Sequence, residues 1–171
     1  MVVSTRVFAG IVLVASGAVL GTALLSQFWG GLAPCELCLL QRWPWDAAVV
    51  IAIIVLFAGG RVGLSWVALI FAIVFAVSIA FAFYHVGVEQ HWFAGPTACT
   101  SNSAGGTTTV EELKRQILGQ QVVMCDRPAW TFHGMSLAGL NLLASLVMAA
   151  FCVVVFVRCR EPARLRGLRR A

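Results

Sequence analysis

The decisive stretch of this sequence is Pro34-Cys35-Glu36-Leu37-Cys38-Leu39-Leu40-Gln41-Arg42, which stands just before a long apolar run. Pro34 favours a turn or a helix start, so we expect Cys35 at the mouth of a helix and Cys38 in its first turn. The positive end of a helix stabilises a thiolate. Arg42 follows Cys38 by four residues and adds a permanent positive charge on the same helix face. This pattern is typical of thiol–disulfide exchange.

Two other uses of such a cysteine pair are a structural disulfide and half of a zinc site. Zinc requires a second pair of ligands at a suitable spacing, and the sequence contains no second CxxC. No spacing of cysteine and histidine around His91 or His133 indicates a metal site either. We therefore predict redox chemistry at the pair and no bound metal.

The composition identifies a membrane protein. Of the 171 residues, 60% are hydrophobic and 11% are charged, whereas a soluble domain has about 45–50% and about 25%. The net charge of +5 comes mainly from six arginines in the tail, Arg158, Arg160, Arg164, Arg166, Arg169 and Arg170. No aromatic residues alternate with them, so they indicate membrane orientation and contact with lipid rather than nucleic acid.

The fold class predicted is an all-α membrane protein, a four-helix up-down bundle in a single domain over residues 1–171. Its spans are the apolar runs at 7–29, 43–59, 64–84 and 136–157, each near the ~20 residues that cross a bilayer. The first run is too long for an ordinary cleaved signal, so we interpret it as a retained span. The second run gains length if its helix starts at the cysteine motif.

The basic residues set the predicted orientation. Both termini, the 59–63 connection and the tail 158–171 share one face, which carries eight of the twelve lysines and arginines. By the positive-inside rule that face is cytoplasmic. The loops 30–42 and 85–135 then lie outside, and tryptophans agree: Trp29, Trp43, Trp45, Trp92 and Trp130 fall near the outer boundary and Trp66 near the inner one.

This topology places four cysteines on the outer face, where disulfides persist: Cys35, Cys38, Cys99 and Cys125. Cys152 falls inside the fourth span as a small packing residue, and Cys159 falls in the cytoplasmic tail. The second outer loop has a capping-box pattern at Thr109, and its apolar residues Val110, Leu113, Ile117 and Leu118 predict a short amphipathic helix along the membrane. That loop suits either a redox shuttle or an inert segment stapled by one disulfide.

Several polar residues fall in or near the spans, where such groups are costly and usually functional. Asp46 follows Arg42 by four residues, so the two are expected to pair. His85 and Glu89 are also four apart, at the depth of the cysteine motif; His85 either donates to a carbonyl ligand or pairs with Glu89. Asn141 is expected to form a hydrogen bond between helices.

Three segments in order, PCELCLLQR, YHVGVE ahead of Cys99, and CDRPAW before the last span, give the chain a resemblance to the bacterial disulfide bond formation protein B (DsbB) family. The resemblance implies an inner-membrane enzyme whose site faces the periplasm. Such an enzyme reoxidises a periplasmic thioredoxin-fold dithiol oxidase (DsbA-like) and passes the electrons to a membrane quinone, either ubiquinone or menaquinone.

Carried onto this sequence, the resemblance implies a role for each outer cysteine. The partner's thiolate attacks Cys99 to give a mixed disulfide, and the released Cys125 attacks the Cys35–Cys38 disulfide at Cys35. Cys38 is then left as a thiolate against the quinone, with Arg42 favouring the anion and polarising the quinone. His85 occupies the place of a quinone-proximal polar residue.

Two alternatives remain from the sequence. A membrane thiol oxidoreductase of the vitamin K epoxide reductase type is also a four-helix bundle with a CxxC, but that family places it near the last core span, after the loop pair. A non-catalytic scaffold or metal-binding subunit held by two ordinary disulfides has no need of Arg42 beside Cys38.

Overall fold

Four long apolar helices dominate the computed structural model, which describes residues 4–58, 61–96, 124–132 and 134–168. They are α1 (Thr5–Phe28), the pair α2 (Glu36–Leu40) and α3 (Arg42–Phe57), α4 (Leu64–Glu89) and α6 (Leu137–Leu168). Each is long and apolar enough to cross a membrane, with the second crossing running from Glu36 to Phe57. The predicted four-helix membrane fold is confirmed. The amphipathic helix predicted after Thr109 lies outside the described residues.

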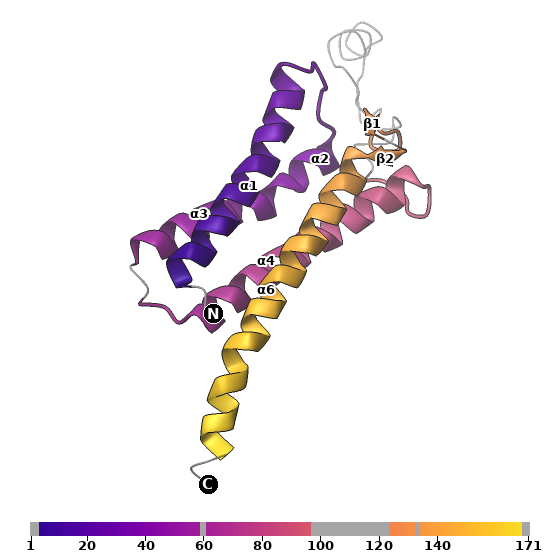
Figure 1. Ribbon diagram of the computed structural model, residues 1–171. Helices are drawn as coiled ribbons and strands as arrows, with labels where there is room; N and C mark the ends of the chain where they lie inside the picture. The colour runs from indigo at the N-terminus through magenta and orange to yellow at the C-terminus, as the bar shows by residue number, and fades with distance from the viewer. Residues whose placement is uncertain (1–3, 59–60, 97–123, 133, 169–171) are drawn as a thin grey trace, which may run out of the picture.

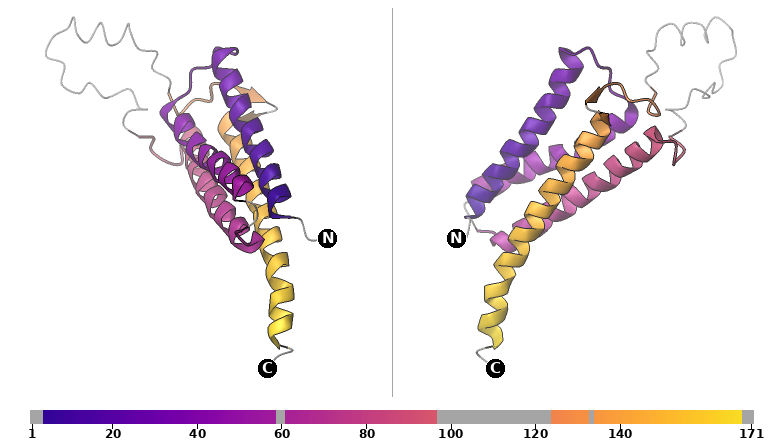
Figure 2. Two further views of the ribbon diagram at one scale, coloured as in Figure 1. Left: turned by 90° about the vertical axis from the view of Figure 1, so that its left-hand side faces the viewer. Right: turned by 45° about the vertical axis from the view of Figure 1, so that its right-hand side comes forward.

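The helices pack as two pairs, α1 against α3 and α4 against α6 (Figures 1 and 2). Aromatic contacts join the pairs: the Phe8 ring meets Phe71 edge-on at 5.9 Å and stacks on Phe151 at 5.4 Å between centroids. Trp45 on α3 meets Phe75 on α4 at 5.1 Å. Trp45 is 1% exposed, so its ring packs in the core of the bundle instead of facing the headgroup region; its depth near the outer boundary stays a prediction.

The two ends of the bundle differ in what they carry. In Figure 1 both termini lie at one end, while α2 and the short hairpin β1 (Thr131–Phe132) and β2 (Met135–Ser136) lie toward the other. An even number of crossings requires this arrangement. The cysteine motif therefore lies away from the termini, as its place after the first span predicts.

Two helix boundaries differ from those read off the apolar runs. The second crossing starts at Glu36, inside the predicted loop 30–42, and it is interrupted at Gln41 between α2 and α3. Pro44 accounts for the interruption, because it lacks an N–H and its ring clashes with the carbonyl four residues earlier. The third crossing continues to Glu89, so His85 lies in a helix and not in the predicted loop 85–135.

The end of α4 stores a small backbone strain at His91, which has φ 59° although it is not glycine. This conformation lets the amides of Trp92 and Phe93 bond back to the Gly87 carbonyl. We expect His91→Gly to raise stability by about 0.5–1 kcal/mol, since glycine adopts this region freely. Thermal unfolding in detergent measures the gain, and His91→Ala is the control. An equal gain from alanine would contradict the explanation.

Candidate functional site

The cysteine pair is held by the first turn of α2. Cys35 is the N-cap, and its sulfur accepts a hydrogen bond from the Cys38 amide at 3.2 Å. Its thiol also donates to the Cys38 sulfur, 2.7 Å away. Cys35 is buried and Cys38 half-buried. The pKa of the Cys35 thiol is raised, first by the hydrogen bond to Cys38 and then by burial. In the reduced pair the proton is thus kept on Cys35, and Cys38 is the sulfur favoured as an anion.

Cys125 lies beside this pair. It packs with Cys35, Leu37 and Val88 in one buried cluster, and Cys38 borders that cluster. Cys125 is disulfide-bonded, and the four free cysteines among the described residues are Cys35, Cys38, Cys152 and Cys159. Cys99 lies outside the described residues, so its predicted role stays a prediction. The fold brings Cys125, from the segment before the last span, to Cys35.

Arg42 projects from the start of α3 toward α1. Its Nη1 donates to Gln27 Oε1 at 2.8 Å, and its Nη2 donates to the Ala23 carbonyl at 3.5 Å. The predicted pairing with Asp46 is wrong: Asp46 is exposed, and the acid–base pair found among the described residues is His85–Glu89, with Nε2 and Oε1 3.9 Å apart. Within the described part of the chain, no carboxylate neutralises the guanidinium charge.

A cavity of about 580 Å³ opens beside the cysteine pair, between α1, α3 and α6. Cys38, Arg42 and His85 line it together with apolar side chains such as Val19, Leu20 and Leu140. Cys35 and Cys125 are not among its lining residues. The two sulfurs of the motif thus face different surroundings: Cys38 borders the cavity, and Cys35 packs against Cys125.

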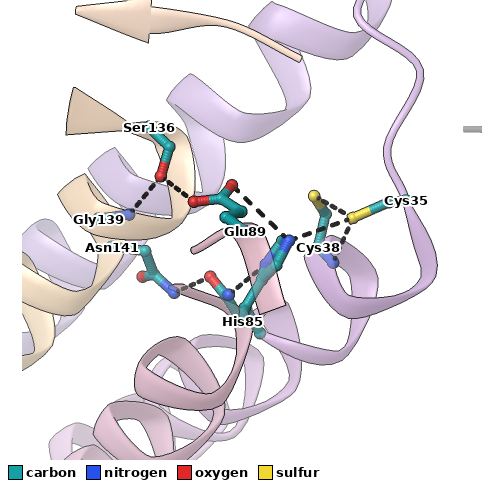
Figure 3. Close-up of polar contacts among 8 residues, drawn as sticks. Cys35, Cys38, His85, Glu89, Ser136, Gly139 and Asn141 are labelled. Carbon is teal, nitrogen blue, oxygen red and sulfur yellow. Dashed lines mark hydrogen bonds and ion pairs between the residues drawn. The ribbon is translucent and has the colours of Figure 1, made fainter. Parts of the chain in front are cut away.

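His85 connects the cysteine pair to the rest of the site (Figure 3). Its ring is 3% exposed. The Nε2 atom lies 3.6 Å from the Cys35 sulfur and 3.9 Å from Glu89 Oε1, and the ring also hydrogen-bonds to the backbone of Cys125. The interpretation of His85 as a partner of Glu89 describes part of these surroundings, and its donation to a carbonyl ligand stays a prediction.

A second set of polar residues supports His85 from the other side. Its Nδ1 lies 2.6 Å from Gln41 Nε2, Gln41 Oε1 accepts from Asn141 Nδ2 at 2.6 Å, and Asn141 Oδ1 accepts from Trp45 Nε1 at 2.8 Å. The predicted interhelical bond of Asn141 is confirmed. Sequence reasoning missed Gln41 and the indole of Trp45. The sequence contains one signal for Gln41. If the second span starts at the cysteine motif, this glutamine lies inside an apolar span and needs a hydrogen-bond partner.

Three possible metal ligands also meet at this point. One sulfur each of Cys35 and Cys38 and one ring nitrogen of His85 lie within 4.8 Å of one another. The sequence contains no second CxxC, but α4 supplies a third ligand type that spacing along the chain cannot reveal. The set is therefore chemically able to bind a thiophilic ion unless the histidine nitrogen already carries a proton.

Comparisons with known proteins agree with this site. The model of the family described as "Disulfide bond formation protein DsbB" matches residues 5–155. The disulfide bond formation protein B of Aromatoleum aromaticum is 30% identical over 92% of this chain and 95% of its own. That of Methylobacillus flagellatus is 28% identical over 83% and 87%. No solved structure matches significantly. The chain belongs to the DsbB family of membrane disulfide bond formation proteins.

Proposed function

We propose that this protein reoxidises a periplasmic thioredoxin-fold dithiol oxidase of the DsbA kind and passes the electrons to a membrane quinone. The main support is the division of the cysteine pair: Cys38 borders a cavity that Arg42 also lines, while Cys35 packs with Cys125. One sulfur can thus exchange with a protein disulfide while the other meets a small acceptor. Family membership supports the disulfide chemistry.

The exchange steps balance as follows. The partner's thiolate attacks Cys99, the bond between Cys99 and Cys125 breaks, and Cys125 carries the electron pair away as a thiolate. Cys125 then attacks the disulfide at Cys35, and Cys38 leaves as a thiolate at the cavity. The partner's second thiol displaces Cys99 and releases the oxidised partner, and the Cys99 thiolate attacks Cys125 and displaces Cys35. The Cys35–Cys38 disulfide re-forms when the pair gives two electrons and two protons to the quinone. A sulfur leaves more readily when its anion is stabilised, and Arg42 provides a positive charge four residues along the same crossing.

The residues around the cavity fit a quinone. The volume of about 580 Å³ is within the usual range for small-molecule sites, and its walls are largely apolar side chains of α1 and α6. The polar groups, Arg42 and His85, gather near Cys38. A quinone supplies the oxidising power by accepting two electrons and two protons. Arg42 supplies donors for a quinone oxygen, and the apolar walls exclude water from the sulfur.

The location follows from the same proposal. The protein is placed in the bacterial inner membrane with both termini cytoplasmic and the cysteine pair on the periplasmic side. Exposed tryptophans lie at the crossing ends on the cysteine side: Trp29, Trp92 and Trp130 just outside crossings, and Trp43 near the start of α3. Trp66 is exposed at the other end. Such rings favour the headgroup region, and the excess of arginine lies with the termini.

The test of the function is a turnover assay. Purified protein in detergent is mixed with a reduced DsbA-like oxidase and a water-soluble quinone, and quinone absorbance is followed. We expect catalytic quinone reduction with matching oxidation of partner thiols. A wild-type protein that gives no turnover with either ubiquinone or menaquinone analogues would remove the proposal and favour the scaffold interpretation.

The cavity itself can be tested with a small substitution on α6. Ala144 lines the cavity, so Ala144→Leu fills part of it and is expected to raise the half-saturating quinone concentration about fivefold. Ala150, exposed on the same helix, provides the control, because Ala150→Leu adds the same atoms outside the cavity. Equal effects of both substitutions would contradict the assignment of the quinone to this cavity.

A further inference from the structure

We propose that Trp45, Asn141 and Gln41 are positioning residues that hold His85 as one tautomer, with its proton on Nε2 and directed toward Cys35. The inference rests on a chain of hydrogen bonds whose direction one residue fixes. The tautomer follows from those bonds alone, and its consequence for Cys35 rests on the proposed function.

Trp45 sets the direction of the chain. An indole N–H can only donate, so the Asn141 atom 2.8 Å from Trp45 Nε1 must be the amide oxygen. The Asn141 amide nitrogen is then the atom 2.6 Å from Gln41, and the Gln41 atom facing it must be the oxygen. Asparagine and glutamine amides have two possible orientations, and their partners decide between them. Here each amide has one orientation that satisfies its neighbours.

The last hydrogen bond of this series fixes the tautomer of His85. With the Gln41 oxygen bound to Asn141, the Gln41 nitrogen faces His85 Nδ1 at 2.6 Å and donates to it. The Nδ1 atom must therefore be the acceptor, and a neutral ring then carries its proton on Nε2. The opposite tautomer would invert both amides and bring the Asn141 N–H group against the indole N–H. His85 and Gln41 are both buried, where two facing donors are costly.

The groups around Nε2 agree with this assignment. The Cys35 sulfur is 3.6 Å away and Glu89 Oε1 is 3.9 Å away, and both can accept a hydrogen bond. Ser136 donates to the other oxygen of Glu89 at 2.5 Å and itself accepts from the Gly139 amide (Figure 3). These bonds hold the Glu89 carboxyl group in place beside Nε2. Each end of the imidazole thus meets groups of the matching kind.

The assignment gives His85 a defined part in the reaction. A ring with its proton on Nε2 cannot remove a proton from Cys35, because its free lone pair on Nδ1 faces Gln41. It can donate a hydrogen bond to the Cys35 thiolate that leaves when the Cys99 thiolate attacks Cys125 in the Cys35–Cys125 disulfide and re-forms the Cys99–Cys125 bond. Hydrogen bonds to a charged acceptor are stronger than neutral ones. His85 therefore stabilises the Cys35 anion rather than acting as a base.

The same tautomer bears on the three possible metal ligands. A thiophilic ion needs the lone pair of Nε2, and histidines that bind metals usually donate the other ring N–H to a carboxylate or carbonyl. Gln41 presents a donor at that position instead. Two near-isosteric substitutions are expected to replace the donor that faces Nδ1 with an acceptor. In Asn141→Asp the residue no longer donates to Gln41, and in Gln41→Glu a carboxylate faces Nδ1; both favour the proton on Nδ1.

The direct test is the ¹⁵N NMR spectrum of the histidine rings in the full-length protein, with His85 assigned by comparison with His85→Gln. We expect the Nε2–H tautomer in the wild type and the Nδ1–H tautomer in Asn141→Asp and Gln41→Glu. Ser145→Ala is the matched control, because it removes another buried bond between α4 and α6, that of Ser78 with Ser145 at 2.8 Å. A wild-type ring protonated on Nδ1, or unchanged signals in both variants, would overturn the tautomer.

Two further measurements test the consequences of the tautomer for metal binding and for the reactivity of Cys35. Cd²⁺ absorbance titrations of the reduced protein should show about tenfold tighter binding in Gln41→Glu than in the wild type or Ser145→Ala. In a Cys38→Ser background, alkylation of Cys35 near neutral pH, read by mass spectrometry, should slow about tenfold with Gln41→Glu. If the NMR result holds and alkylation is unchanged, the role toward Cys35 is wrong. Loss of quinone turnover in the wild type, by contrast, removes the proposed function and leaves the tautomer standing.

Discussion

Cys38→Ser is expected to lower quinone reduction by at least about 1,000-fold while leaving the first exchange with the partner intact. A serine cannot form the disulfide with Cys35, so the electrons that reach Cys125 have no path to the cavity that Cys38 borders. When several residues act together in catalysis, removing one of them abolishes most of the rate that they provide together. The assay is quinone absorbance, with the mixed disulfide of the partner trapped and identified separately.

The control for this loss is another cysteine of the same protein. Cys152 is fully buried in the helix core and has no part in the proposed exchange, so Cys152→Ala should retain turnover within about twofold, a cost limited to packing. Full turnover by Cys38→Ser would remove the enzyme mechanism. A variant that loses the mixed disulfide as well would show that the substitution disturbs the outer loops and not the last step alone.

The crossings and the cysteine motif were predictable from the sequence because their signals are local. An apolar run of ~20 residues has few alternatives to a membrane helix, and a proline before a CxxC marks the start of a helix turn. Cys35 as the N-cap and the extension of the second crossing to the motif follow from neighbours along the chain. The resemblance to the DsbB family used the same local segments.

The parts that sequence reasoning missed depend on contacts between distant residues. Arg42 has an acidic residue four positions away, yet it turns to Gln27 on α1, because α3 exposes Asp46 on its outer face. The Trp45 ring was expected to meet the headgroup region because of its place near a span end, yet it is buried against Phe75. Spacing along one helix cannot say which face meets a neighbour when nearly every side chain is apolar.

Arg42→Ala is expected to raise the half-saturating quinone concentration about 10- to 100-fold, with a smaller effect on the rate at saturation. The reason is that a charged donor to a quinone oxygen contributes about 1.5–3 kcal/mol, and Arg42 is the cavity-lining residue among those described that carries a permanent positive charge. Initial rates over a range of quinone concentrations separate the two parameters. An unchanged half-saturating concentration would contradict the role assigned to Arg42.

Gln27→Leu distinguishes the charge of Arg42 from its placement. Gln27 accepts from Arg42 Nη1 at 2.8 Å, so its removal leaves the charge but releases the guanidinium from α1. We expect a smaller effect on the half-saturating quinone concentration, about three- to tenfold, because one hydrogen bond to the charged group is lost. Arg42→Lys keeps the charge but loses the planar fork that can meet Gln27 and a ligand oxygen together, and it should fall between Gln27→Leu and Arg42→Ala. If Arg42→Lys matched the wild type, charge alone would suffice, and the orientation set by Gln27 would have no part in quinone use.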